Sequence, residues 1–132
     1  MTKKRILLID DQDDIREVAQ LSLEMVGGWQ VITGSSGREG IAKAELEQPD
    51  AILLDVMMPE LDGFATFQEL RANQATKQIP VIFLTAKVSS DDRRQFFELG
   101  VNGVITKPFD PMSLATEIET TLGWDSSLID NG

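Results

Sequence analysis

Three runs of four apolar residues constrain the fold of this chain more than any other feature, and they lie at 6–9, 51–54 and 81–84. Runs this short and continuous are typical of strands that are buried on both faces, as in a parallel sheet. Two weaker strand candidates, at 29–33 and 101–106, follow glycine residues. The sequence therefore predicts about five strands.

The segments that follow these strands carry apolar residues at intervals of three and four, which is the spacing of one helix face. We expect most of the aromatic side chains among them to fill the core. In chain order, the predicted apolar faces comprise Ile15, Val18, Leu21 and Met25; Ile41, Ala42 and Leu46; Phe64, Phe67 and Leu70; Phe96, Phe97 and Leu99; and Leu114, Ile118 and Leu122.

Capping residues predict where several of these helices begin and end. Gly27 is a natural end for the first helix. Ser36 and Glu39 have the spacing of a capping box at the start of the second helix. The fourth helix is predicted to begin near Ser89, and Asp110, which a proline follows, is predicted to open the last one.

Strand and helix alternate about five times along the chain, which predicts a parallel sheet with helices on both faces. We therefore expect an α/β fold, a doubly wound three-layer sandwich built from repeated strand–helix units. A chain of 132 residues has room for one such domain. We place this domain at 1–124, and we expect 125–132 to form a flexible C-terminal tail.

The composition excludes several kinds of chemistry. The chain has no cysteine and no histidine, which rules out disulfides, thiol catalysis, Ser-His-Asp catalysis and zinc sites built from thiolate or imidazole. The net charge of −10 argues against nucleic acids and anionic membranes as direct partners. The run at 6–9 is too short for a signal peptide or a membrane span, so we expect a cytoplasmic protein.

Polar side chains follow the predicted strands, at the edge of the sheet where a doubly wound fold binds its ligands. Taken singly, each could be an ordinary turn, cap or loop residue. Together, clustered carboxylates favour a hard cation such as Mg²⁺, and a hydroxyl and an ammonium group favour an incoming anion. The set, which predicts a phosphoryl-transfer site, comprises Asp10 and Asp11, Asp55, Thr85 and Lys107.

These residues carry a family resemblance, because the sequence resembles a response-regulator receiver domain of two-component signalling over about residues 4–122. Each of the motifs is weak alone, but their order and spacing are specific. The matching elements are Asp10-Asp11, Leu53-Leu54-Asp55-Val56-Met57-Met58-Pro59, Leu61-Asp62-Gly63, Thr85-Ala86 and Lys107-Pro108-Phe109.

The resemblance implies a flavodoxin-like strand order of 2-1-3-4-5 and a phosphoacceptor role for Asp55. It implies that Thr85 hydrogen-bonds a phosphoryl oxygen and that Lys107 pairs with the phosphoryl group. It also implies a cis peptide bond between Lys107 and Pro108.

The resemblance further implies Mg²⁺ as the cofactor. Asp11, Asp55 and the backbone carbonyl of Met57 would bind the ion directly, and Asp10 would bind it mainly through water. We interpret Asp62 and the glycine after it as a turn beside the site and not as a ligand pair.

The implied partners are a sensor histidine kinase or a histidine phosphotransfer protein as phosphodonor and a downstream protein as target. The absence of histidine agrees with this, because in this family the phosphohistidine belongs to the donor. The domain would catalyse only its own phosphorylation and dephosphorylation. We expect no direct binding to DNA or membrane, and either a monomer or a phosphorylation-dependent homodimer.

Two features bear on regulation, and the second departs from the family pattern. Met57 and Lys87 occupy the positions that flank the water attacking the aspartyl phosphate, and because Met57 cannot orient a water we expect a phosphoryl lifetime longer than in the fastest members of the family. Val104 stands where many receivers carry a tyrosine or phenylalanine that swings inward as the threonine, here Thr85, moves. We therefore expect the switch to reshape the fourth helix, fifth strand and last helix through backbone shifts.

Three alternatives remain open at this stage. The chain could be a receiver that binds partners without phosphorylation, although none of the expected site residues is lost. It could be a magnesium-dependent phosphatase of the haloacid dehalogenase type, although the aspartates at 10 and 11 are adjacent and no cap domain fits. Nucleotide binding lacks any glycine-rich phosphate loop.

Overall fold

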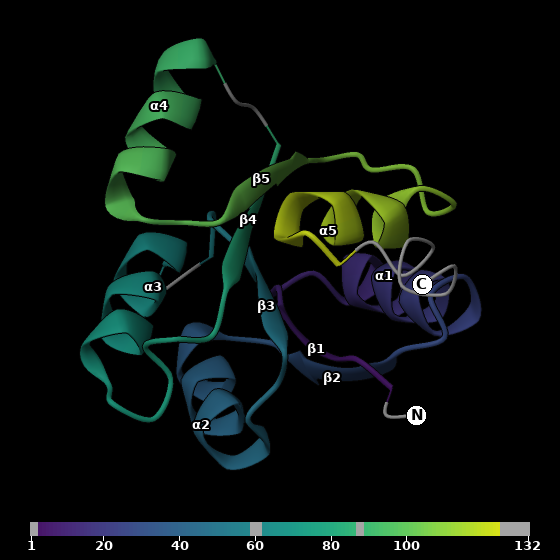
Figure 1. Ribbon diagram of the computed structural model, residues 1–132, viewed down its shortest axis with the longest axis horizontal. Coiled ribbons are helices and arrows are strands. Elements are labelled where there is room, and N and C mark those ends of the chain that lie inside the picture. The colour runs from purple at the N-terminus through teal and green to yellow at the C-terminus, as the bar shows by residue number, and fades with distance from the viewer. Residues whose placement is uncertain (1–2, 59–61, 87–88, 125–132) are drawn as a thin grey trace.

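Each predicted apolar run forms a strand in the computed structural model, which describes residues 3–58, 62–86 and 89–124 (Figure 1). Strands and helices alternate along these residues. In chain order they are β1 (Arg5–Ile9), α1 (Asp13–Met25), β2 (Gln30–Gly34), α2 (Gly37–Glu47), β3 (Ala51–Asp55), α3 (Gly63–Ala72), β4 (Val81–Thr85), α4 (Ser90–Leu99), β5 (Gly103–Thr106) and α5 (Leu114–Leu122).

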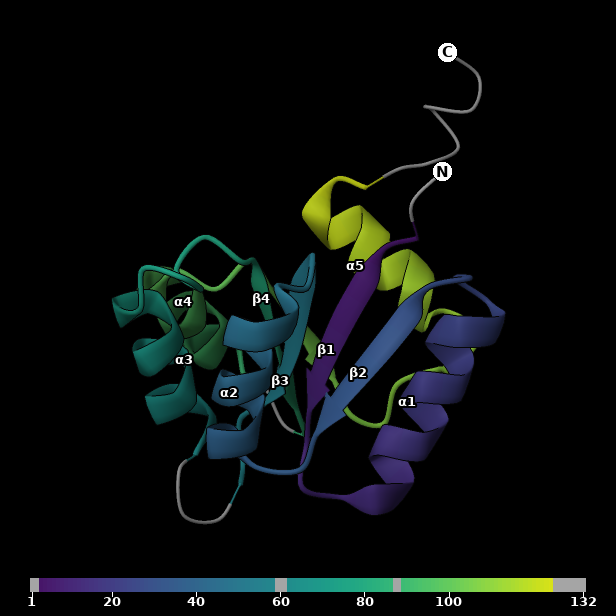
Figure 2. The same ribbon diagram turned by 90° about the horizontal axis from the view of Figure 1, so that it is seen from below.

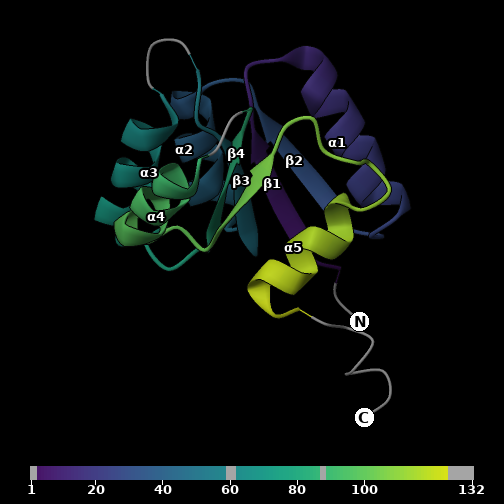
Figure 3. The ribbon, with the colours of Figure 1, turned by 90° about the horizontal axis from the view of Figure 1, so that it is seen from above.

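The strands form one parallel sheet in the order β2-β1-β3-β4-β5, which confirms the predicted topology. In the register, Ile6 of β1 lies between Val31 of β2 and Ala51 of β3. Helices α1 and α5 cover one face of the sheet, and α2, α3 and α4 cover the other (Figures 2 and 3). The result is the doubly wound three-layer sandwich that the alternation predicts.

Successive residues of each inner strand enter different cores, which explains why the strands are apolar throughout. Ile6 and Leu8 pack with α1 and α5, whereas Leu7 and Ile9 pack with the helices on the opposite face. On that second face, Phe83 of β4 contacts Phe64, Phe67 and Phe96 edge-on, at centroid distances of 5.2 to 5.6 Å.

The predicted apolar face of α1 is wrong in part. The helix buries Ala19, Ser22 and Leu23 against the sheet, with Ile15 packed beside them. Val18, Leu21 and Met25 are exposed by 43%, 58% and 75%. The helix carries two apolar stripes, and the one with small residues faces the sheet, where the Ser22 hydroxyl also donates a hydrogen bond to the Pro111 carbonyl in the segment before α5.

The faces of α2 and α4 also differ from the prediction. Helix α2 buries Gly37, Gly40 and Ala44, whereas Ala42 and Leu46 are exposed. A Cβ atom on Gly40 would lie 2.3 Å from Ile9 Cδ1, so α2 needs a glycine to approach β1 this closely. Helix α4 buries Phe96, but Phe97 and Leu99 are about half exposed.

Several predicted boundaries shift by one to four residues. Helix α1 ends at Met25, and Gly28, not Gly27, takes the left-handed conformation with φ of 69°. Strand β5 begins at Gly103 and not at 101. Helix α5 begins at Leu114, because the Asp110 carboxylate caps a separate turn before it.

Only half of the capping box predicted for α2 forms. Ser36 accepts a hydrogen bond from the Glu39 N–H at 3.1 Å, but the Glu39 carboxylate bonds Ser35 instead of returning to Ser36. These bonds lower the pKa of Glu39. A complete box forms at the start of α4, between Ser89 and Asp92.

Among the described residues, no helix is both long enough and apolar enough to cross a membrane.

Candidate functional site

The ends of four strands bring the predicted site residues together at one edge of the sheet, called the carboxyl edge below. Asp10 follows β1, Asp55 ends β3, Thr85 ends β4 and Lys107 follows β5. Asp10, Asp55 and Thr85 are 0%, 2% and 5% exposed, whereas Asp11 is exposed. One carboxylate oxygen from each of the three aspartates lies within 4.8 Å of the other two.

The ammonium group of Lys107 lies between these carboxylates. Its Nζ is 2.8 Å from Asp10 Oδ2 and 3.4 Å from Asp55 Oδ1. The Lys107 side chain is only 12% exposed, so water screens these ion pairs weakly. Among the described residues, Asp10 Oδ2 is the one buried side-chain oxygen that makes no hydrogen bond of good geometry.

Backbone groups fix the two buried carboxylates. The Gln12 N–H donates to Asp10 Oδ1 at 2.9 Å, and the Met57 N–H donates to Asp55 Oδ1 at 3.2 Å. The Arg16 guanidinium donates to the Asp10 backbone carbonyl at 2.6 Å. Each carboxylate is therefore oriented by the loop that follows its own strand.

The pKa of Asp55 is raised from its ordinary 3.8 to about 6. Burial is the largest cause and the charge of Asp10 the second, whereas Lys107 and the Met57 N–H oppose the rise. One ammonium group therefore does not offset two buried carboxylates, and the site favours additional positive charge.

The donor set fits a hard divalent cation. Three carboxylates converge, one of them exposed to water, and the buried oxygen Asp10 Oδ2 has the Lys107 ammonium group beside it but no hydrogen bond of good geometry. Such oxygen ligands with open positions for water suit Mg²⁺. The Met57 carbonyl belongs to the same loop as Asp55 and could add a fourth oxygen.

The remaining predicted residues surround this cluster. Within the described part of the chain, the Thr85 hydroxyl makes no hydrogen bond, so it can donate to an anion bound beside Asp55. The Met57 side chain is 73% exposed at the rim. The Lys107–Pro108 peptide bond is cis, as the resemblance implied. Lys87 lies outside the described residues.

Sequence reasoning missed three residues that support the site. Gln12 and Arg16 contact Asp10, and only the fold brings the Gln12 side chain to Lys107. Gly63 lies against the Asp55 backbone, where a Cβ atom would approach the Asp55 carbonyl oxygen to 2.4 Å. The glycine after Asp62 was the available signal, but it indicated only a turn. Asp62 itself caps α3, as its carboxylate accepts from the Ala65 N–H.

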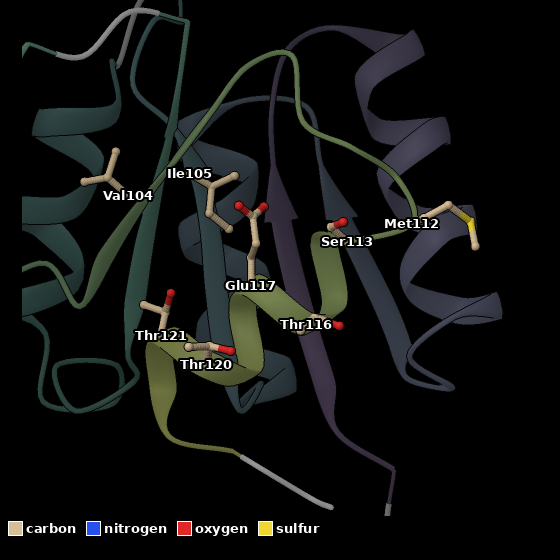
Figure 4. Close-up of a pocket in the computed structure, with 8 residues that line it drawn as sticks. All are labelled: Val104, Ile105, Met112, Ser113, Thr116, Glu117, Thr120 and Thr121. Carbon is tan, nitrogen blue, oxygen red and sulfur yellow. The ribbon is translucent and has the colours of Figure 1, made fainter.

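A separate hollow of about 340 Å³ lies between β5 and the outer face of α5 (Figure 4). In Figure 4 the Glu117 carboxylate points toward β5, whereas Met112 points away from it. Val104, the position expected to carry an aromatic ring, lines the hollow and also packs against the Phe83 side of the core. The lining residues are Val104, Ile105, Met112, Ser113, Thr116, Glu117, Thr120 and Thr121.

A doubly wound parallel sheet with three carboxylates and a lysine at its carboxyl edge defines an α/β domain suited to binding a cation and a phosphoryl group. The chain belongs to the response regulator receiver domain family, whose model matches residues 6–119. This match spans nearly all of the sheet and the helices around it.

Sequence similarity to individual curated proteins supports the same family assignment. The chain is 41% identical over 119 residues to the alkaline phosphatase synthesis transcriptional regulatory protein PhoP of Bacillus subtilis, covering 90% of this chain and 48% of PhoP. The chain spans about half the length of the curated relatives it matches.

Solved structures agree as well. The chemotaxis response regulator CheY4 of Vibrio cholerae superposes with a TM-score of 0.84 at 31% identity, covering 91% of this chain and 99% of CheY4. The receiver domain of sensor histidine kinase PA1611 from Pseudomonas aeruginosa PAO1 superposes with a TM-score of 0.80 at 30% identity, covering 92% of this chain and 99% of that domain. That domain was solved with a magnesium ion coordinated in its active-site cleft.

Proposed function

We propose that this chain accepts one phosphoryl group on Asp55 from the phosphohistidine of a sensor histidine kinase or histidine phosphotransfer protein. The observation that carries the proposal is the buried Asp55 carboxylate, which faces two further carboxylates and one ammonium group. An Asp55 oxygen forms a bond to phosphorus while the bond from phosphorus to the donor imidazole nitrogen breaks. The electron pair of that bond returns to the imidazole, which takes up a proton.

The surrounding residues orient the group and offset its charge. Lys107 pairs with the phosphoryl oxygens, and Thr85 donates a hydrogen bond to one of them. Asp11, Asp55 and the Met57 carbonyl would hold Mg²⁺, with Asp10 bound mainly through water. When bound, Mg²⁺ supplies positive charge against the oxygens of the transferring group. The magnesium in the PA1611 receiver domain supports this assignment.

We propose that the domain acts on no other substrate and catalyses only the gain and loss of its own phosphoryl group. Loss occurs by in-line attack of water on the phosphorus. The exposed Met57 side chain offers no hydrogen bond to orient that water, so we expect the phosphoryl group to be lost slowly from the purified protein.

The output surface in this proposal is the face of α4, β5 and α5, and the target is a downstream protein. A valine cannot swing as a ring does, so Val104 would transmit the change at Thr85 through backbone shifts. Amide exchange within 86–122 should then differ with and without a phosphoryl mimic. The net charge of −10 supports a protein partner over DNA for this domain, although relatives such as PhoP are transcriptional regulators. We also propose a cytoplasmic location, where the domain would meet its proposed phosphodonor.

Intact-mass measurement tests the central step. Incubation with acetyl phosphate and Mg²⁺ should add the mass of one phosphoryl group to the wild type and none to Asp55→Ala. Asp50→Asn, at the opposite edge of the sheet, is the matched control and should gain the group normally. Equal uptake by wild type and Asp55→Ala, or no uptake by either, would refute the assignment.

A further inference from the structure

Gln12 is the residue before α1, but its side chain does not cap that helix. Side chains at this position usually accept a hydrogen bond from the first turn. The Gln12 amide oxygen instead accepts a hydrogen bond from Lys107 Nζ at 3.1 Å, across 95 positions of sequence. Because the Gln12 N–H also bonds the Asp10 carboxylate, this one residue contacts both the acidic loop and the lysine.

The contacts of the Lys107 ammonium group are uneven. An ammonium group has three hydrogens to donate, and three oxygens surround this one. Nζ lies 2.8 Å from Asp10 Oδ2 and 3.1 Å from Gln12 Oε1, but 3.4 Å from Asp55 Oδ1. The two nearer oxygens belong to the loop between β1 and α1, so the ammonium group is drawn toward that loop and away from Asp55.

We propose that Gln12 is a positioning residue for Lys107, a role that rests on the proposed function of the site. By accepting one ammonium hydrogen, Gln12 keeps Lys107 from closing fully onto the Asp55 carboxylate. Asp55 then stays available to a cation and to the incoming phosphorus, while Lys107 stays within reach of the phosphoryl oxygens.

The neutral amide of Gln12 suits this role better than a carboxylate would. Asp11, Asp13 and Asp14 already flank the position, and Asp10 and Asp55 lie beneath it. A further carboxylate would add repulsion and would compete for the cation, whereas an amide oxygen accepts a hydrogen bond without a formal charge. Without an acceptor at 12, Lys107 would settle between the two buried carboxylates and oppose cation binding.

Binding of Mg²⁺ in the absence of any phosphodonor tests the role. Gln12→Leu keeps the bulk of the side chain and removes its acceptor, and we expect it to weaken Mg²⁺ binding about three- to tenfold, as expected for one hydrogen bond. The matched control is Gln20→Leu, because Gln20 bonds Glu24 on the same helix and should leave Mg²⁺ affinity unchanged. In a Lys107→Met background, Gln12→Leu should then have no effect, since its partner is gone.

Two further measurements separate positioning from a general structural role. The rate of phosphorylation by acetyl phosphate should fall in Gln12→Leu with the melting temperature unchanged. In metal-free protein, the ¹⁵N-resolved ammonium signal of Lys107 should shift in Gln12→Leu and not in Gln20→Leu. Wild-type Lys107 signals in Gln12→Leu, or equal losses of Mg²⁺ affinity with and without Lys107, would overturn the role of Gln12. Failure of the wild type to take up phosphate would overturn the proposed function and leave the metal-free test of Gln12 valid.

Discussion

At the carboxyl edge of the sheet two carboxylates, Asp10 and Asp55, are buried beside a single ammonium group, whereas at the opposite, amino edge the cations are well matched to their acceptors. Arg5 there binds the Glu47 carboxylate at 2.6 Å, and its backbone N–H bonds the Asp50 carboxylate at 2.8 Å. Negative charge is therefore left in excess at the carboxyl edge, whereas charged groups are paired at the amino edge.

Arg71 extends this matching at the amino edge. It lies in the last turn of α3 and donates hydrogen bonds to the carbonyls of Lys77, Ile79 and Gly100 and to the Asn102 side chain, at 2.9 to 3.3 Å. Its guanidinium also packs 4.7 Å from the centroid of the Phe67 ring. These contacts join α3 to the segments that lead into β4 and β5.

Aromatic packing closes the amino edge beside β1 and β2. The rings of Trp29 and Trp124 meet edge-on at a centroid distance of 5.8 Å, and Lys4 Nζ lies 4.4 Å from the Trp124 ring centroid. Trp29 is 7% exposed. The amino edge thus contributes stability, while the carboxyl edge holds charge that a ligand could relieve.

The largest expected effect comes from breaking the amino edge. Trp29→Ala removes a buried ring and leaves Trp124 without its partner, so we expect a loss of about 3 kcal/mol in the free energy of unfolding. Denaturant unfolding measures this loss. Trp124→Ala should cost less, because that ring is only partly buried. A Trp29→Ala variant as stable as wild type would show that the aromatic packing does not stabilise this edge.

At the carboxyl edge, removing the charge of Asp55 should raise the free energy of unfolding, whereas the substitution at the amino edge lowers it. Burial, together with the charge of Asp10, raises the pKa of Asp55 to about 6. Between about pH 4 and pH 6 the folded protein therefore keeps the Asp55 proton, whereas the unfolded chain has lost it. The stability that this proton provides is complete below about pH 4 and is lost as the pH rises through 6. We therefore expect Asp55→Asn to be about 2 kcal/mol more stable than wild type at pH 7.5 without Mg²⁺.

The pH dependence distinguishes this effect from a simple change of packing. The advantage of Asp55→Asn should shrink through pH 6 and vanish near pH 4. Asp50→Asn at the amino edge is the matched control and should not gain stability, because Asp50 is exposed and accepts the bond from the Arg5 N–H. An advantage that persists unchanged at pH 4 would contradict the electrostatic explanation.

Features set by nearby sequence could be predicted, whereas features set by contacts between distant segments could not. Asp10, Asp55 and Lys107 could be placed together because each directly ends or follows a strand, and parallel strands end at one edge. The buried stripe of α1 could not be predicted, because Val18 and Ala19 are both apolar and the local spacing does not record which stripe meets distant segments, as Ser22 meets Pro111, 89 positions away. Gln12 stayed hidden for the same reason, since its partner Lys107 is distant in sequence.

Glycines illustrate a second limit. Gly40 and Gly63 lie in helices and are needed because a strand comes close to them, the Ile9 side chain to Gly40 and the Asp55 backbone to Gly63. The local sequence does not record these approaches. Gly27 and Gly28 both suit a helix end, and the positive φ of one of them follows from how the chain turns into β2.

A smaller effect tests whether the amino edge depends on the fork of hydrogen bonds from Arg71. Arg71→Lys keeps the charge, but one ammonium group cannot reach all four acceptors, so we expect a loss of about 1.5 kcal/mol. Arg94→Lys is the control, because Arg94 is exposed and its guanidinium comes no closer than 4.0 Å to the Asp91 carboxylate, so its ion pair is weak. Equal stability of both variants would mean that the charge of Arg71, and not its geometry, holds these segments.

The smallest expected effect is that of Mg²⁺, which would reduce the excess negative charge that distinguishes the carboxyl edge from the amino edge. If the carboxyl edge is destabilised by unmatched negative charge, Mg²⁺ should stabilise the wild type at pH 7.5, by about 1.4 kcal/mol at ten times its dissociation constant. Asp55→Asn should gain less, because it has lost both a ligand and the repulsion that the ion relieves. Melting curves with and without Mg²⁺, at constant ionic strength, measure this difference. Equal gains in both proteins would mean that Mg²⁺ acts elsewhere on a chain of net charge −10, and the carboxyl edge would then not be the place where the ion binds.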